Sequence, residues 1–424
     1  FVVGNPPYVR QEAIPKDDLT RYRLEFDCFY DRADLYVAFF EKGLKLLEHG
    51  GCLGFICPDR FAKNNYGKKL RALISRDYAV ESVLDLAQAS PFVPDVTCYP
   101  GIFILRRENN YLKPRQVDYF RLTEASAKEC ETVRRRKSDS AVIYHRYDTW
   151  FTGEQQWSVE SPEHLALLRK LEADHVSLGD EASGCRVGIG VATGADGVFI
   201  VDGDFTGVER ELLMPLVTTT DIASGQVDWR GKCVINPFVG DTPHLIDLPR
   251  YPKARKYFES HRQRLLGRNV AKRDTDRWYR TIDRIYPDLQ WRKKLLIPDI
   301  KADTLIVLEE GKLYPHHNLY YVASDYWDLR ALRTVLRSSV SRFFVWMYGV
   351  KMRGDFLRFQ AQYLRRICVP HLMTLSKRLM NKLVDVGASS DQDAIDGAVA
   401  ELYGLNDRQI ELARSVSARR PSTR

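Results

Sequence analysis

Apolar positions in the first hundred residues follow two patterns, a helical spacing and short continuous runs. The spacing at positions 36, 40, 44 and 47 predicts a helix that Gly50-Gly51 ends, and a second helix is predicted at 66–76. Apolar runs predict strands at 52–57, 80–86 and 101–105, and Phe1 to Val3 are typical of the end of a further strand. Strands that alternate with helices predict an α/β fold, here half of a doubly wound sheet over residues 1–107.

Beyond residue 107 the pattern changes. Residues 108–160 are polar and charge-rich, including the run Arg134–Lys137, and predict a linker. Residues 11–31 predict a loop, which either lies over the active-site mouth and meets DNA phosphates or is a solvated surface loop. Short runs at 198–201, 232–235, 295–297, 304–308 and 319–322 predict a strand-rich α+β domain over 161–372. An amphipathic helix is predicted at 329–348 and two more, at 374–386 and 392–403, in a C-terminal segment 373–414. The tail 415–424 is predicted to be disordered.

Composition narrows the class of protein. The chain has 424 residues, 44% of them hydrophobic, which suffices for two or three globular domains. Its formal net charge of +8 and pI near 8.9 favour a polyanionic partner. The sequence has no apolar run long enough to span a membrane, and its eight cysteines lack any Cys-x-x-Cys pair, so we expect reduced thiols and a cytoplasmic protein. The first residue is Phe1 rather than Met, which indicates a piece of a longer polypeptide.

The stretch Asn5-Pro6-Pro7-Tyr8 carries the candidate chemistry. The two prolines fix φ and forbid a helix, so Asn5 is held at the carboxyl end of the first strand, the edge where open α/β sheets bind ligands. An exocyclic amine is a poor nucleophile because its lone pair is delocalised into the ring. The Asn5 side-chain oxygen and the Pro6 carbonyl accept hydrogen bonds from such an amine and turn its lone pair toward an electrophile. Tyr8 is then placed to stack on a base turned out of a duplex.

This tetrapeptide matches the catalytic motif of S-adenosylmethionine-dependent amino-methyltransferases. With the chain that follows, it resembles the gamma-group N6-adenine DNA methyltransferases of type II and IIG restriction-modification systems. The resemblance implies a class I, Rossmann-like methyltransferase sheet with an antiparallel last strand. It also implies S-adenosyl-L-methionine as cofactor, with Asn5 and Pro6 beside it, and a second base-stacking aromatic at Phe92 in the loop before the last strand. In such fused enzymes a nuclease domain or subunit is a further partner.

The downstream domain resembles the target-recognition domain of the same enzymes, at residues 213–222, 293–301, 314–320 and 358–370. A basic segment interleaved with aromatic residues, from Arg262 to Lys294, lies between its strands. It is the best candidate for contact with double-stranded DNA, since Lys and Arg neutralise phosphates and read guanine edges. The predicted DNA-binding residues are Arg268, Lys272, Arg273, Arg277, Lys293, Lys294, Lys301, Arg358 and Gln360.

The first half of such a fold, with its glycine-rich cofactor turn, is not found. Gly188 to Gly194 is the one candidate, but the apolar run at 198–201 predicts a strand where a helix is required. We therefore expect the missing cofactor half upstream or on a partner chain. His316 and His317 are adjacent, yet no third ligand follows at useful spacing, so no metal site is predicted.

Two other functions remain open from the sequence. An enzyme that methylates an RNA base or a protein glutamine shares the tetrapeptide, although it carries the motif near its end, whereas more than 400 residues follow it here. A non-catalytic DNA-binding subunit is the second alternative, because no cofactor turn is recognised.

Overall fold

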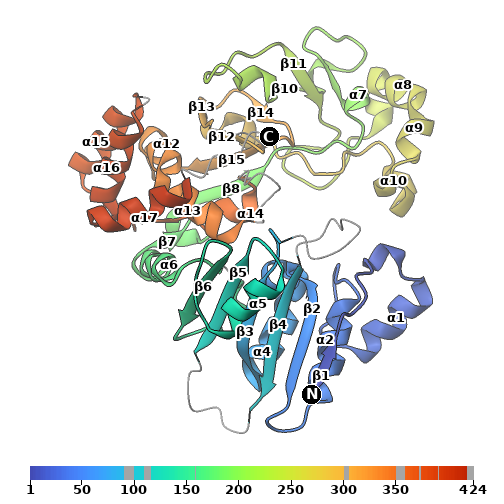
Figure 1. Cartoon of the computed structure of the whole chain (residues 1–424). Coiled ribbons are helices and arrows are strands. Elements are labelled where there is room, and N and C mark those ends of the chain that lie inside the picture. Colours follow the sequence, from blue (N-terminus) through green and yellow to red (C-terminus); the bar gives the residue numbers. More distant parts are fainter. Residues whose placement is uncertain are drawn as a thin grey trace. The chain divides into compact units, whose positions relative to one another are not determined.

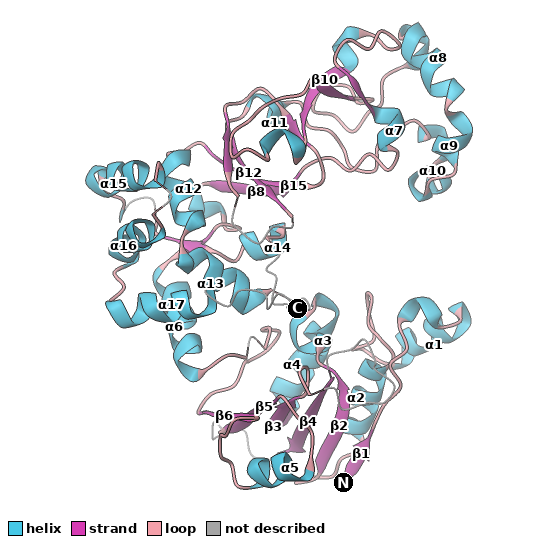
Figure 2. Ribbon diagram, turned by 45° about the horizontal axis from the view of Figure 1, so that its top comes forward, coloured by secondary structure: helices cyan, strands magenta, loops and turns pink. Residues whose placement is uncertain are grey.

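A computed structural model of the chain describes residues 1–89, 100–108, 116–157, 159–299, 305–349, 359–371, 374–389 and 391–417. The chain divides into two compact units, Phe1–Ala166 and Leu167–Arg424 (Figures 1 and 2). Within the described ranges, no helix is both long and apolar enough to cross a membrane.

Unit 1 is built on a six-stranded sheet of order β1-β2-β4-β3-β5-β6. Strand β1 runs parallel to β2, whereas β4 is antiparallel to both β2 and β3. This inserted antiparallel strand confirms the expectation from the family resemblance, and the predicted strands at 52–57, 80–86 and 101–105 are confirmed with small shifts at their ends. The strands are β1 (Val2–Gly4), β2 (Cys52–Pro58), β3 (Tyr78–Asp85), β4 (Pro100–Arg107), β5 (Val117–Leu122) and β6 (Val142–Tyr147).

Helices cover both faces of this sheet. The two predicted helices are present as α2 (Tyr36–Lys45) and α4 (Lys68–Asp77), which contact each other on one face, while α5 (Ala127–Arg134) lies on the other (Figures 1 and 2). The short helix α3 (Arg60–Lys63) directly follows β2. It delivers Phe61 to an aromatic core, where the ring centroids of Phe61 and Phe40 are 5.0 Å apart.

The linker predicted at 108–160 is wrong for the part that the structure describes, because β5, α5 and β6 extend the sheet of unit 1. Asp118 on β5 shows why the charged residues of 108–160 led to the wrong prediction of a linker. Its carboxylate accepts from Arg136 Nε at 2.6 Å and from Arg146 Nε at 2.9 Å, and Tyr144 donates to it at 2.8 Å. Charged residues that the sequence suggested were solvated are therefore paired within unit 1, and the first domain runs past residue 107 into α6 (Pro162–Asp174).

The loop predicted at 11–31 is also wrong in its middle, which is helix α1 (Lys16–Glu25). Asp17 and Asp18 lie in its first turn and Arg23 in its last, an arrangement that complements the helix dipole. No residue of α1 is buried, so the helix has no apolar stripe for a hydrophobic period to show.

Unit 2 contains two four-stranded sheets, of order β14-β10-β11-β9 and β13-β12-β15-β8, and a two-stranded sheet of β16 and β7. Residues of both larger sheets, among them Leu216, Val234, Leu296 and Tyr321, share one buried cluster. The expected strand-rich domain is thus present. Its strands are β7 (Val176–Ser177), β8 (Cys185–Ile189), β9 (Ile200–Asp202), β10 (Leu213–Val217), β11 (Lys232–Ile235), β12 (Lys294–Pro298), β13 (Val307–Glu309), β14 (Tyr314–Pro315), β15 (Leu319–Ser324) and β16 (Cys368–Val369).

The strand predicted at 198–201 begins only at Ile200, since residues before it form the short helix α7 (Asp196–Phe199). Val198 and Phe199 are buried, and a short buried apolar run does not distinguish a helix from a strand. The basic segment and the residues just before it fold mainly as short helices. Figure 2 shows α8 (Pro252–Ser260), α9 (Arg262–Leu266) and α10 (Asn269–Arg273) at the opposite end of unit 2 from the C-terminal helices. Helix α11 (Asp288–Trp291) instead contacts β14.

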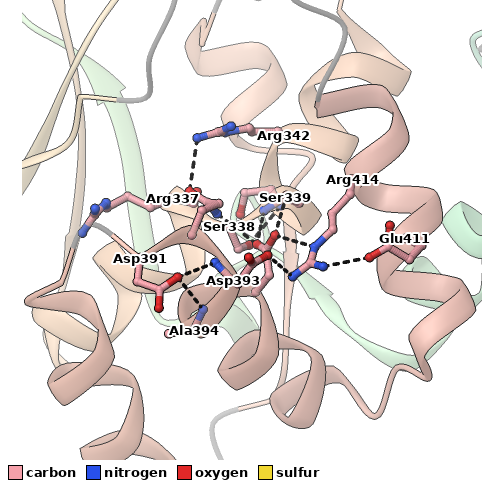
Figure 3. A network of polar contacts seen from close by, with 12 residues as sticks. Arg337, Ser338, Ser339, Arg342, Asp391, Asp393, Ala394, Glu411 and Arg414 are labelled. Atoms are coloured by element: carbon pink, nitrogen blue, oxygen red, sulfur yellow. Dashed lines mark hydrogen bonds and ion pairs between the residues drawn. The ribbon is translucent and has the colours of Figure 1, made fainter.

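The helix predicted at 329–348 is two helices, α12 (Leu329–Arg337) and α13 (Ser339–Tyr348). They separate at Ser338, whose side chain accepts from Ser341 N, and Asp396 accepts from both the amide and the hydroxyl of Ser339 at 2.8 Å. Figure 3 shows the polar network around Ser339, which Arg414 joins by donating to Asp396 at 3.1 Å. This network fixes the point at which α12 ends and α13 begins.

The remaining helices are α14 (Ala361–Leu364), α15 (Lys377–Gly387), α16 (Gln392–Tyr403) and α17 (Asp407–Ser417). Helices α15 and α16 match the predictions at 374–386 and 392–403, and α12 contacts both of them, so residues 373–414 are part of unit 2 rather than a separate segment. Helix α17 was not predicted. It occupies residues 415–417 of the tail predicted to be disordered, and the rest of that tail lies outside the described residues.

Candidate active site at the carboxyl edge of the first sheet

Asn5-Pro6-Pro7-Tyr8 directly follows β1, at the carboxyl end of a strand parallel to β2. Gly4 pairs with Phe55 of β2, and a Cβ at Gly4 would lie 3.3 Å from the Phe55 ring, so the two strands approach closely here. Asn5 is exposed, whereas Pro6 is buried. The turn is therefore anchored by Pro6 and presents the Asn5 amide to solvent at the predicted edge.

Tyr8 ties this turn to the neighbouring strand. Its hydroxyl donates to the carbonyl of Ile56 at 3.2 Å, and its side chain is half-buried. One residue on, the Val9 carbonyl accepts from Leu35 N at 2.9 Å, just before α2. The motif is thus held between β2 and the start of α2, so it is a fixed feature of unit 1.

Two acidic residues lie at the carboxyl ends of β2 and β3, which β4 separates in the sheet: Asp59 follows β2 and Asp85 ends β3. Burial, aided by the negative charge of Asp85, raises the pKa of Asp59 to about 6. Burial also acts on Asp85, but Arg121 at 3.1 Å and the Tyr119 hydroxyl at 2.8 Å outweigh it and lower the pKa of Asp85. The edge therefore carries one fixed carboxylate and one carboxyl that titrates near neutrality.

A hollow of about 540 Å³ next to the motif was not predicted. Three arginines from separate segments line it, Arg10, Arg32 and Arg60, together with the acidic Glu12. Asp34 also lines it, and burial raises the pKa of that carboxyl. The one sequence signal for this hollow is Arg10, two residues after the tetrapeptide, because the other arginines join it only through the fold.

The predicted DNA-binding residues of unit 2 fall into two groups. Lys272 and Arg273 are exposed at the end of α10. Arg277 donates to the Pro243 carbonyl, exposed Lys293 pairs with Glu310 at 2.6 Å, and the Gln360 side chain accepts from Gln362 at 2.9 Å. These side chains are at least partly accessible and are compatible with a surface role.

Lys294 is a correction, because its side chain is internal, whereas Arg268 is half-buried. The Lys294 side chain is 0% exposed, and its ammonium pairs at 2.5 Å with the carboxylate of Glu309, whose side chain is 2% exposed. The guanidinium of Arg268 donates to the carbonyls of Thr193, Leu265 and Trp278 at 2.8–3.1 Å. The Lys294 ammonium is thus used inside unit 2, and the DNA role of Arg268 stays a prediction. Phe92, Lys301 and Arg358 lie outside the described residues.

The glycines at 188–194 serve backbone contacts. A Cβ at Gly188 would lie 2.4 Å from the Tyr321 ring, and one at Gly190 would lie 2.2 Å from the Pro315 carbonyl oxygen. Only four residues of helix follow, in α7. The segment does not fit a cofactor cradle, which needs backbone N–H groups opening a longer helix, so the sequence-based rejection agrees with the geometry.

His316 and His317 follow β14 directly. Burial and the neighbouring His317 lower the pKa of His316, against the influence of Asp196. The structure brings Asp196, 120 residues earlier in the chain, within 3.2 Å of His316 Nε2. The fold therefore brings to the two histidines a third possible ligand that spacing along the chain did not show.

Comparison with known proteins places this geometry in a family. The Eco57I restriction-modification methylase family matches residues 1–92, which hold the tetrapeptide. The type II methyltransferase M.BstVI of Geobacillus stearothermophilus is 44% identical over 422 residues, which cover 98% of this chain and 75% of that protein. M.PaeR7I of Pseudomonas aeruginosa is 46% identical over 413 residues, covering 96% of this chain and 71% of that protein. The chain belongs to the type II methyltransferases of restriction-modification systems.

The fold of this type II methyltransferase also resembles a solved structure. The type IIL restriction-modification enzyme MmeI, solved in complex with DNA, superposes with a TM-score of 0.62 at 10% identity. The match covers 98% of this chain and 56% of the MmeI chain. At this identity the likeness concerns the fold, and it spans both units of the chain.

Proposed function

We propose that the chain is the part of a site-specific DNA adenine-N6 methyltransferase that holds the target amine and recognises DNA. One observation carries the proposal, namely that Asn5 is exposed at the carboxyl end of β1 while buried Pro6 and the Tyr8–Ile56 hydrogen bond fix the turn around it. The relatives, which are named type II methyltransferases, support methyl transfer. The tetrapeptide offers two oxygens that accept N–H bonds, from the Asn5 side chain and the Pro6 carbonyl, and this supports an exocyclic amine as the methyl acceptor.

The chemistry assigned to the turn needs no strong base. The Asn5 side-chain oxygen and the Pro6 carbonyl accept the two N–H bonds of the adenine amine, which draws the nitrogen toward tetrahedral geometry and frees its lone pair. S-adenosylmethionine, when bound, supplies the electrophilic methyl group. Tyr8 stacks on the face of the flipped adenine, with Phe92 proposed on the opposite face. A dipole held in advance at the reacting amine is worth about 10²–10³ in rate, by analogy with single oxyanion-hole groups.

Unit 2 is proposed to hold the duplex. Its exposed cations Lys272 and Arg273 lie on a short helix, and Lys293 is exposed just before β12. Such side chains neutralise phosphates, while base-edge contacts set the sequence recognised. The similar fold of MmeI, solved in complex with DNA, supports DNA as the partner.

We also propose that most of the cofactor pocket comes from residues outside this chain, on the same polypeptide or on a partner. Two observations support this. The glycines at 188–194 do not form a cradle, and the edge strand β1 exposes an apolar side chain, Val3, at 83%. An exposed apolar edge strand is normally covered by another element.

The test is transfer of labelled methyl from S-adenosylmethionine to duplex DNA that lacks methyladenine. The chain is compared with a form extended upstream to the length of M.BstVI, each with and without Asn5→Ala. We expect N6-methyladenine that falls about 10²–10³-fold with Asn5→Ala, while DNA affinity stays unchanged. Product that is N4-methylcytosine, or labelling of RNA or protein instead of DNA, would replace the adenine proposal.

The non-catalytic DNA-binding subunit is distinguished by the same experiment. If neither form methylates DNA while both bind it, and Asn5→Ala changes nothing, the tetrapeptide is a structural turn. Activity confined to the extended form instead supports a catalytic turn whose cofactor residues lie outside this chain.

A further inference from the structure

Three potential metal ligands meet in unit 2 from two distant segments. Asp196 begins α7, and His316 and His317 follow β14. Among the described residues, one ligand atom from each of the three lies within 4.8 Å of the other two. His316 Nε2 is 3.2 Å from Asp196 Oδ2, and the two imidazole centroids are 4.1 Å apart.

The backbone brings these residues together without help from their side chains. His316 N donates to the Val217 carbonyl at 2.9 Å and His317 N to the Val191 carbonyl at 3.1 Å. Gly190 permits the approach, because a Cβ there would lie 2.3 Å from the His316 carbonyl oxygen. Main-chain hydrogen bonds therefore already hold these two segments together. The backbone does not explain why two imidazoles and a carboxylate meet there.

A hydrogen bond explains only two of the three groups. His316 and Asp196 satisfy each other, but the Nδ1 atom of His317 is buried without a hydrogen-bond partner. Buried polar atoms in native proteins almost always have a partner. A metal ion is one partner that binds an imidazole nitrogen directly.

The spacing also suits an ion. Ligand atoms about 2.0–2.1 Å from a tetrahedral Zn²⁺ lie roughly 3.3–3.4 Å apart, close to the 3.2 Å between His316 Nε2 and Asp196 Oδ2. The second oxygen of Asp196 accepts from the Thr193 hydroxyl, the kind of outer contact that orients a carboxylate ligand. Asp196 is 46% exposed, so the ion has a path from solvent.

We propose that Asp196, His316 and His317 bind one divalent transition-metal ion of the zinc class, with water in the fourth position. Two imidazoles and a carboxylate form a donor set that zinc accepts, and three protein ligands with an open position are a known zinc arrangement. The ion links the loop before α7 to the end of β14. That loop carries the Thr193 carbonyl on which Arg268 is anchored at 2.9 Å, so the ion also steadies the basic segment.

The test titrates the EDTA-treated, dialysed chain with Co²⁺ as a visible probe and then with Zn²⁺. We expect one equivalent of Co²⁺ with d–d absorption of a four-coordinate ion, displaced by Zn²⁺, and a thermal unfolding midpoint raised by Zn²⁺. His317→Ala and Asp196→Asn should each lower the affinity at least about tenfold, a loss that even outer contacts of a metal site produce. His244→Ala is the matched control, since this exposed histidine of the same unit lies outside the cluster and its loss should leave binding unchanged.

Asp196→Asn separates loss of the metal from loss of the fold, because the Asn amide keeps an oxygen that accepts from the Thr193 hydroxyl. Its circular dichroism and unfolding midpoint in EDTA should match those of the unchanged chain. The proposal is overturned if the unchanged chain takes up no stoichiometric ion, or if His317→Ala and Asp196→Asn bind the ion as the control does. Neither readout uses methyl transfer, so the test is independent of the proposed function.

Discussion

Lys294 and Glu309 form an ion pair inside unit 2, with the ammonium nitrogen 2.5 Å from the carboxylate and both side chains buried. Burial lowers the pKa of Lys294, against the influence of Glu309. Glu309 also accepts from the backbone N–H groups of Gly311, Lys312 and Leu313. The carboxylate is thus the centre of the turn between β13 and β14, and the lysine neutralises it.

Lys294→Met should therefore act on stability rather than on DNA. Removing one partner of a buried ion pair leaves an uncompensated charge and costs about 3–5 kcal/mol, so we expect a loss of that order in the free energy of unfolding, measured in urea. Lys293→Met is the control, because its exposed pair with Glu310 should contribute less than about 1 kcal/mol. Equal losses for the two variants would contradict the internal role of Lys294.

The misassignment of Lys294 shows what the sequence can and cannot specify. The apolar run at 295–297 predicts a buried strand. The adjacent Lys294 was nevertheless predicted to lie at the surface, because its partner Glu309 is on another strand and cannot be recognised from the local sequence. The same limit hid β5, whose Asp118 is paired with Arg136 and Arg146. Local patterns reveal elements whose apolar periodicity is undisturbed, and buried ion pairs disturb it.

The candidate site divides in the same way. Asn5 to Tyr8 are contiguous, so the sequence predicts their position at the strand end directly. Groups that converge from distant segments were missed. Arg32 and Arg60 meet Arg10 only in the folded unit, and Asp196 meets His316 across 120 residues. Spacing along the chain carries no information about such partners.

Tyr8 offers a test of stacking against anchoring. Tyr8→Phe removes the hydrogen bond to the Ile56 carbonyl but keeps the ring, and should cost about 1 kcal/mol of stability with methyl transfer largely retained. Tyr8→Ala also removes the ring, and base–aromatic stacking is worth about 1–3 kcal/mol, so kcat/KM should fall roughly 5–150-fold further. The measurement is steady-state DNA methylation by each variant, made in whichever form methylates DNA, the chain itself or the form extended upstream. Equal activities for Phe and Ala would mean that the ring does not stack on the base.

Asp59 should make stability depend on pH. Its folded-state pKa of about 6 exceeds that of an exposed Asp, so the native state retains a proton that the unfolded chain has lost. Stability is therefore greatest below about pH 4 as far as this group is concerned, and falls as pH rises through 6, by up to about 3 kcal/mol. Asp59→Asn should abolish this part of the slope and be the more stable form at pH 8. Urea unfolding at several pH values measures it, with exposed Asp17→Asn expected to follow the unchanged chain; a wild-type slope in Asp59→Asn would refute the assignment.

The exposed cations of the basic segment and its half-buried Arg268 should respond differently to salt. Lys272 and Arg273 are exposed at the end of α10, and if each neutralises one phosphate, its replacement by Ala lowers the slope of log K against log salt by about 1. Arg268→Ala removes hydrogen bonds to three carbonyls, so it should destabilise unit 2 and, for the folded fraction, leave the slope unchanged. Lys232→Ala is the surface control, because its ammonium already pairs with Asp202 at 2.7 Å. Fluorescence anisotropy with duplex DNA at several salt concentrations separates the two classes. A slope that changes with Arg268 but not with Lys272 or Arg273 would mean that the DNA contacts lie elsewhere on the chain.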